Sequence, residues 1–446
     1  MSAQRPVVRP ASPWRQPTPA ETTLPNGIRL LTHDVPGQQV IAVRTVLPVS
    51  LADEPREVEG ITVMLARLLD EGAGDLDAEA FALALERQGA VLGAGALDGA
   101  LSVDMDVPVR HLEPALRLLT SAVAEPLLPE DEVRRVLRNR IAEYDHESAS
   151  APHRAARELL SALWADEARA SRPTAGTPAT IEAIDRAALR ARHDNLGVEG
   201  ASVVIAGALD GVDVGALAAS TLGAWTAAGR RPAPVVAPTP RGGGTRIVVV
   251  DRPGSVQSEF ALGTPSIGRS DSSWPAHPVL AYLLGGSPNA RLDALLREDK
   301  GYTYGIRASM RPRVAGGSFV ISGSVRSEVT AESLDLILGV VDGAREGFPR
   351  AEIAKGVDFI TRATPGRWAT ADAVADETAA LAMEGLPWDF QQRTLKAMAR
   401  LGPDDLASAM AGLAPEGWAT VIVADAEQVV PGIEALGVGT VEVVSD

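Results

Sequence analysis

The chain has 446 residues, 46% hydrophobic and 22% charged, which is enough for two large globular domains with sizeable cores. Its formal net charge of -16 and the lack of a basic cluster argue against binding to nucleic acid or to anionic membrane surfaces. Cysteine is absent, so disulfides, thiolate metal sites and a cysteine nucleophile are excluded. With no apolar stretch of about 20 residues and no signal-like N-terminus, a cytoplasmic protein is expected.

Two segments are predicted to lie outside the globular domains, as an arm and a linker. Prolines recur through residues 1–20 and prevent an amphipathic helix, so an extended N-terminal arm is expected there. Residues 229–246, GRRPAPVVAPTPRGGGTR, combine prolines with three consecutive glycines, a composition typical of an interdomain linker. The chain is thereby divided into an N-terminal α+β domain over residues 21–228 and a C-terminal α+β domain over residues 247–446.

The first half shows strand and helix periodicities in a definite order. Alternation of apolar and polar residues predicts strands, and apolar residues at helical spacing predict helices. The predicted order is two strands, two helices, a strand pair and two helices, at residues 26–35, 40–50, 60–69, 78–88, 91–99, 100–109, 111–123 and 130–144.

The second half repeats this order. Its predicted strands and helices are at residues 246–251, 258–265, 277–286, 290–300, 303–310, 317–325, 331–347 and 350–363. A repeated order of elements indicates a duplicated domain. We therefore predict an α+β protein with two homologous lobes that face each other across a chamber, each lobe a mostly antiparallel sheet with helices packed on one face.

Residues 60–95, GITVMLARLLDEGAGDLDAEAFALALERQGAVLGAG, resemble the segment that carries the zinc motif in pitrilysin-type metallopeptidases, the family of insulinase and the mitochondrial processing peptidase. Catalytic members read H-x-x-E-H here, with two imidazoles as zinc ligands and a glutamate that takes a proton from metal-bound water. The corresponding positions in this chain are Val63, Ala66 and Arg67. Two of these side chains have no lone pair and the third is a permanent cation, so no metal is expected in this chain.

Residues 283–310, LLGGSPNARLDALLREDKGYTYGIRASM, are similar to the C-terminal signature of the same family. The resemblance implies that Arg297 and Tyr304 bind peptide substrate and reach across the chamber towards a zinc site. A phenol can stabilise negative charge on the scissile carbonyl, and an arginine can hold a substrate carbonyl or carboxylate. Two alternatives stay open. Tyr302 would point to the same strand face and act as the donor, or Arg297 merely ends a helix and Tyr304 packs beside Ile306.

The resemblance implies a subunit that is inactive alone. Some members of the family are heterodimers with zinc on one subunit and the arginine–tyrosine pair on the other, so a homologous H-x-x-E-H partner that holds zinc is expected, with a peptide as substrate. Residues 89–99 offer an edge that an extended peptide could join. The rival hypothesis is a structural or assembly protein with no catalytic role. A third is an active enzyme whose metal site is not evident, although none of the six histidines forms an i,i+4 pair.

Overall fold

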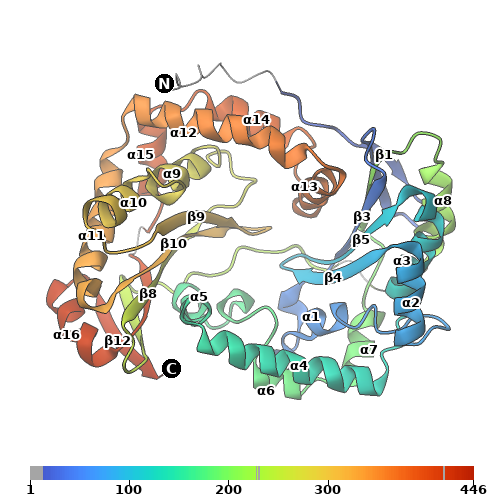
Figure 1. Cartoon of the computed structure of the whole chain (residues 1–446), viewed down its shortest axis with the longest axis horizontal. Helices are drawn as coiled ribbons and strands as arrows, with labels where there is room; N and C mark the ends of the chain where they lie inside the picture. Colours follow the sequence, from blue (N-terminus) through green and yellow to red (C-terminus); the bar gives the residue numbers. More distant parts are fainter. Residues whose placement is uncertain (1–13, 228, 230–231, 415–416, 446) are drawn as a thin grey trace, which may run out of the picture.

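The protein consists of two lobes that face each other, each built on a six-stranded mixed sheet with helices (Figure 1). The computed structural model describes residues 14–445 except residues 228, 230–231 and 415–416. Most of the predicted N-terminal arm, residues 1–13, lies outside the described residues. Its described remainder, residues 14–19, leads without regular structure into the first strand.

The first sheet has the strand order β1-β2-β6-β3-β5-β4. Its strands are β1 (Ala20–Thr23), β2 (Arg29–Asp34), β3 (Val40–Pro48), β4 (Val91–Leu97), β5 (Ala100–Pro108) and β6 (Ser202–Gly207). Strands β2 and β6 run parallel, and all other neighbours run antiparallel. The central strand β6 is buried along its whole length.

The second sheet has the order β12-β7-β11-β8-β10-β9. Its strands are β7 (Arg246–Asp251), β8 (Gln257–Ser266), β9 (Ile306–Pro312), β10 (Gly317–Arg326), β11 (Ala419–Ala424) and β12 (Thr440–Ser445). The five strands from β7 to β9 repeat the order and directions of the five from β2 to β4, including one parallel pair next to three antiparallel ones. Only the outer strand differs, since β12 is parallel and β1 antiparallel to its neighbour. The predicted duplicated, mostly antiparallel α+β fold is confirmed.

Most helices pack within the half of the chain that encodes them. In the first half these are α1 (Ile61–Ala66), α2 (Ala78–Gln88), α3 (Leu112–Ala124), α4 (Glu130–Ala149), α6 (Pro178–Glu182), α7 (Arg186–Asp194) and α8 (Val214–Ser220). In the second half they are α9 (Ala276–Gly285), α10 (Arg291–Asp293), α11 (Thr330–Gly343), α12 (Arg350–Ala363), α14 (Phe390–Met398), α15 (Pro403–Ala411) and α16 (Ala426–Leu436). Among the described residues, no helix is both long and apolar enough to cross a bilayer.

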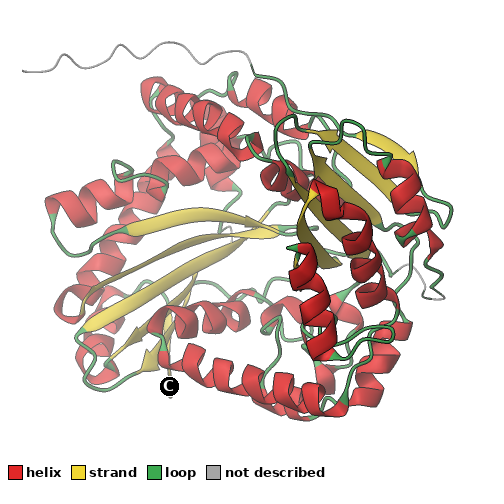
Figure 2. Cartoon of the chain, turned by 45° about the vertical axis from the view of Figure 1, so that its right-hand side comes forward, coloured by secondary structure: helices red, strands yellow, loops and turns green. Residues whose placement is uncertain are grey.

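Two helices are exchanged between the lobes. Helix α5 (Ala151–Leu163) comes from the first half but packs on β8 and β11 of the second sheet, and α13 (Ala371–Glu384) comes from the second half but packs on β3 and β6 of the first sheet (Figure 1). The prediction of helices on one face of each sheet is therefore wrong in this respect. Each sheet has its own helices on one face and a helix from the opposite half of the chain on the other. Helices therefore lie on both sides of the strands (Figure 2).

Close packing holds α5 in place. Its buried residues Leu159 and Leu163 contact β8 at Gly263, where an added Cβ would come within 3.1 to 3.3 Å of both leucines. A larger residue at this position would push the helix from the sheet. The lack of a side chain at Gly263 therefore permits the close approach of the exchanged helix.

Replacing Leu159 with alanine is expected to lower the free energy of unfolding by about 2–5 kcal/mol, because it leaves a cavity between the lobes. Chemical denaturation would measure this loss. The matched control is Leu83→Ala on α2, where the side chain is 43% exposed and little loss is expected. Equal losses in the two variants would contradict the assigned packing of α5.

Polar contacts hold α13 on the first sheet. The buried guanidinium of Arg44 on β3 donates from Nε to Asp376 of α13 at 2.6 Å and from Nη1 to Asp106 of β5 at 2.9 Å. Beside it, Nε2 of the buried His33 on β2 lies 2.9 Å from Oγ1 of Thr378 on α13. The exchanged helix is therefore fixed by an ion pair and a hydrogen bond to two different strands.

The packing of α13 on the first sheet is expected to become less stable at acidic pH. Burial lowers the pKa of His33 from 6.5 to about 4, so the folded state resists a proton that the unfolded chain accepts. Stability is therefore lost as the pH falls below about 6.5, by about 2 kcal/mol at about pH 5. Denaturation of the protein and of a His33→Gln variant at about pH 7 and pH 5 would test this. Identical pH dependence in the two proteins would refute it.

The lobes also meet at two hairpin turns. Asp98, in the turn between β4 and β5, forms an ion pair with Arg313, which follows β9. Gly99 lies beside Val314 and Val235 of the second hairpin and the linker, since an added Cβ would be 3.1 and 3.2 Å from their methyl groups. The edge strands β4 and β9 therefore end close to each other between the lobes.

Candidate functional site

The helix that corresponds to the zinc motif is α1, and its start is fixed by a buried carboxylate. Glu54 accepts hydrogen bonds from the backbone N–H groups of Gly60 at 3.1 Å and Thr62 at 3.0 Å, and it pairs with Arg169 at 3.1 Å. Gly60 adopts a φ of 99°, and an added Cβ would lie 2.8 Å from the backbone of Ala175. Glu54 could not be recognised from the sequence alone as the residue that positions this helix.

The three motif positions do not provide metal ligands. Val63 packs against the N-terminal core, and Ala66 is buried within it. Arg67 forms an ion pair with Glu143 on α4, with Nη1 at 2.9 Å from Oε1 and 2.8 Å from Oε2. The guanidinium therefore neutralises the carboxylate of Glu143.

This ion pair continues into a network along α4. The buried Arg140 donates to Glu147 at 2.8 and 3.0 Å and lies 3.4 Å from Glu143. The hydrogen bond from Arg140 lowers the pKa of Glu147, which keeps that carboxylate ionised. Within the described residues, no group of three or more His, Asp or Glu side chains could hold a metal ion. The donor set at α1 does not fit zinc.

Arg297 and Tyr304 flank one turn of the second lobe. Arg297 lies in a π-helical turn (Ala294–Asp299) that extends α10, and its side chain is 41% exposed with Nε 3.5 Å from Glu298. Tyr304 precedes β9 and is 94% exposed, so the alternative in which it packs beside Ile306 is wrong. Both side chains are available to a molecule that approaches from outside.

A buried carboxylate clamps the loop that carries Tyr304. Asp293 is fully buried, accepts a hydrogen bond from the backbone N–H of Ile306 at 2.8 Å, and pairs with Arg307. Inside the loop, Oγ1 of Thr303 accepts from the backbone N–H of Gly305 at 3.0 Å. Asp293 was not singled out from sequence, although an aspartate on an otherwise apolar helix face was an available signal.

The two tyrosines of the loop are held differently. The hydroxyl of Tyr302 donates to Glu332 on α11 at 2.8 Å, and Lys300 binds the same carboxylate at 3.1 Å. Residues 302–305 precede β9, so the expectation that Tyr302 and Tyr304 share a strand face is wrong. Tyr302 ties the loop to α11, whereas Tyr304 extends into solvent.

The edge strand β4 is open on one side. It pairs only with β5, and Val91 and Leu97 on it are exposed. No atom of the described residues lies within 4 Å of a Cβ built on Gly93 or Gly95, so the sheet face is open at these two glycines. Such an edge can accept an extended peptide as an additional strand.

These features define a two-lobed peptidase-fold protein that keeps the motif helix but not its zinc ligands. A family model described as the peptidase M16 inactive domain matches residues 183–358. Over this segment the chain is similar to the pitrilysin-type, or M16, peptidases.

Relatives support this assignment. An uncharacterized zinc protease of Mycobacterium tuberculosis is 28% identical over 355 residues, which cover 78% of this chain and 80% of that protein. A peptidase M16 inactive domain from Pseudomonas fluorescens superposes with a TM-score of 0.83 at 22% identity, over 91% of this chain and 98% of that one. A protease from Helicobacter pylori gives 0.84 at 18% identity, over 92% and 99%. The solved structures share the fold.

Proposed function

We propose that this chain is the non-metal-binding subunit of a heterodimeric zinc peptidase and that Arg297 and Tyr304 act at the zinc site of a homologous H-x-x-E-H partner. The observation that carries the proposal is the 94% exposure of Tyr304 on a loop that Asp293 clamps through the backbone N–H of Ile306. Such an exposed tyrosine contributes little to the stability of this chain. It can act if it enters the active site of a partner.

The chemistry suits attack by zinc-bound water on a peptide carbonyl. Negative charge develops on the carbonyl oxygen, and a fixed phenol that donates a hydrogen bond stabilises it. The guanidinium of Arg297 can bind a substrate carbonyl or carboxylate and orient the peptide. Because α1 of this chain has no metal ligands, the zinc belongs to the partner. The open edge of β4 gives the peptide a backbone to pair with.

Purification of the tagged chain from its native host, followed by mass spectrometry, tests the partnership. We expect a copurified chain of similar size that contains H-x-x-E-H, near one-to-one stoichiometry. Turnover of a quenched peptide library should require both chains, and neither should cleave alone. The fraction in which the pair is found would also test the predicted cytoplasmic location.

Other outcomes would support a different function. Self-association alone, or partners without the motif, would favour a structural or assembly protein. Stoichiometric zinc and turnover in the isolated chain would identify an active enzyme and refute the proposal.

A further inference from the structure

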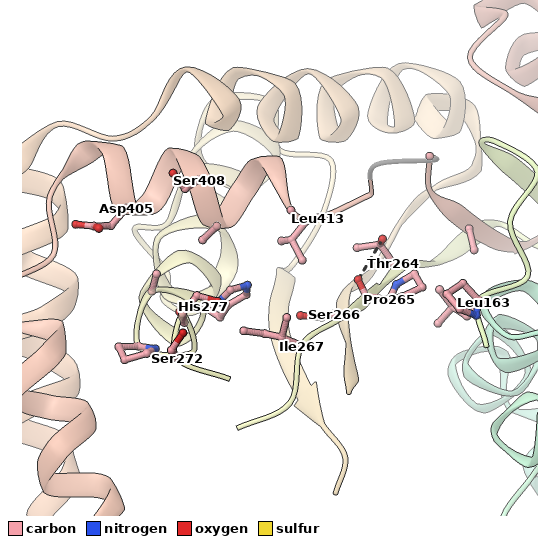
Figure 3. A pocket seen from close by; sticks show the side chains of 18 of the residues that line it. Leu163, Thr264, Pro265, Ser266, Ile267, Ser272, His277, Asp405, Ser408 and Leu413 are labelled. Carbon is pink, nitrogen blue, oxygen red and sulfur yellow. Dashed lines mark hydrogen bonds between the residues drawn. The ribbon is translucent and has the colours of Figure 1, made fainter. Parts of the chain in front are cut away.

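A cavity of about 600 Å³ lies in the second lobe (Figure 3). Among the described residues, its lining includes neither the helix α1 nor Arg297 or Tyr304. The walls come from the end of β8, the start of α9, the helix α15 and the segment that follows it. This volume falls within the range of small-molecule sites in proteins.

The cavity joins parts of the chain that are distant in sequence. Leu163, at the end of the exchanged helix α5, forms one wall, and Pro240 in the linker forms another. The linker is fixed there, since the backbone N–H of Arg241 donates to the carbonyl of Leu163 at 2.9 Å. A molecule in the cavity would therefore contact both halves of the protein and the segment between them.

One buried imidazole defines the polar character of the cavity. His277 is 4% exposed, and its Nδ1 lies 3.2 Å from the carbonyl oxygen of Ser273. A carbonyl can only accept, so Nδ1 carries the proton, and Nε2 of the neutral ring is an acceptor. Burial lowers the pKa of His277, which favours this neutral form. The ring thus presents an acceptor to a bound molecule.

The charges of the other residues that line the cavity sum to zero. The charged side chains in the lining are Arg246 and Asp405, one of each sign. Oδ2 of Asp405 accepts from the backbone N–H of Gly402 at 2.8 Å and so caps α15. The hydroxyl of Ser266 is buried and has no hydrogen-bond partner among the described residues. The rest of the lining is mainly alanine, leucine, proline and glycine.

We propose that this cavity binds an uncharged small molecule with an apolar body and one hydroxyl or amide N–H that donates to Nε2 of His277. The apolar lining favours the body, and the neutral acceptor of His277 favours a neutral donor. A charged head would lose its hydration beside one lining residue of each sign, Arg246 and Asp405, which together supply no net counter-charge. Because the occupant contacts α5 and the linker as well as the second lobe, its binding stabilises the arrangement of the two lobes. The proposal requires neither a partner nor zinc.

Three probes with the same body test the choice of ligand. They are 4-phenylbutan-1-ol, 4-phenylbutanoate and 4-phenylbutylamine, which are neutral, anionic and cationic. We expect the alcohol to raise the melting temperature saturably and to bind about ten-fold more tightly than either charged probe. Trp274 is a reporter, because its ring stacks on His277 at a centroid distance of 6.4 Å. Its fluorescence should change on binding, and Trp274→Phe should remove that change without removing the melting shift.

Two variants locate the site. Ala409→Phe fills the cavity and should abolish the melting shift, and His277→Phe keeps the ring but removes the acceptor, which should weaken the alcohol about five-fold. If Ala409→Phe does not fold, the His277→Phe result decides. Equal binding of the three probes, an unchanged shift in a folded Ala409→Phe protein, or unchanged affinity in His277→Phe would overturn the proposal.

Discussion

Substitution of Tyr304 by phenylalanine is expected to lower kcat of the assembled peptidase by about 10²- to 10³-fold, because it removes the hydrogen-bond donor to the developing oxyanion. The side chain is 94% exposed and forms no hydrogen bond with another described residue, so folding and assembly should be unchanged. Steady-state kinetics with a cleavable peptide would measure the effect, and gel filtration of the mixed subunits would verify assembly.

The matched control is Tyr302→Phe, two residues away in the same loop. It removes the hydrogen bond that ties the loop to Glu332 but leaves the phenol of Tyr304 and the Asp293 clamp in place, so a much smaller loss of turnover than in Tyr304→Phe is expected. If Tyr302→Phe abolished turnover and Tyr304→Phe did not, the donor would be Tyr302. If neither variant lost activity, the proposed role of this loop would be refuted.

The double variant Val63→His/Arg67→His is expected to bind one zinc ion per chain. Val63 on α1 and its C-cap Arg67 are one helical turn apart. Removal of the Arg67 guanidinium, which lies within 2.9 Å of Glu143, leaves that carboxylate with only Arg140 at 3.4 Å. Two imidazoles and a carboxylate form a common zinc ligand set. Metal analysis after gel filtration and calorimetric titration would measure binding in the double variant and in the unchanged protein.

Removing Glu143 from the double variant provides the control. A further Glu143→Gln substitution should weaken zinc binding by more than about 100-fold, since loss of a ligand costs more than loss of an outer hydrogen bond. Equal zinc affinity with and without Glu143 would show that α1 and α4 do not frame a metal site. The double variant should still not cleave peptides, because Ala66 cannot act as a base, and a third substitution, Ala66→Glu, is required to test for activity.

Local periodicity explains why much of the fold could be predicted. Helix α2 runs over Ala78–Gln88 as expected, because Asp77 caps its start and Gly89, with a φ of 61°, ends it. The strand pair β4–β5 likewise follows its alternating pattern. The exchange of α5 and α13 could not be predicted in this way. Their amphipathic patterns require an apolar partner surface but do not identify the sheet that supplies it.

The candidate site shows the same division. A resemblance over short motifs identified Val63, Ala66, Arg67, Arg297 and Tyr304 as positions of interest. The contacts that fix these positions join residues that are not neighbours in sequence: Arg67 with Glu143, 76 positions away, and Asp293 with Ile306, 13 positions away. Neither pair could be inferred from one sequence without a structure. The cavity beside His277 could not be predicted from the sequence either, since its walls come from several distant segments.

The exchange of helices also governs how this protein can be made. The first sheet has all its strands once residue 207 has been synthesised, but its inner face, with Leu31 and Val204, stays bare until α13 emerges much later. Helix α5 must likewise wait for the second sheet. An apolar surface left uncovered during translation is a site for chaperone capture or aggregation. Neither half can therefore complete its packing before the other half has been synthesised. A chain truncated before residue 371 should be retained by chaperones.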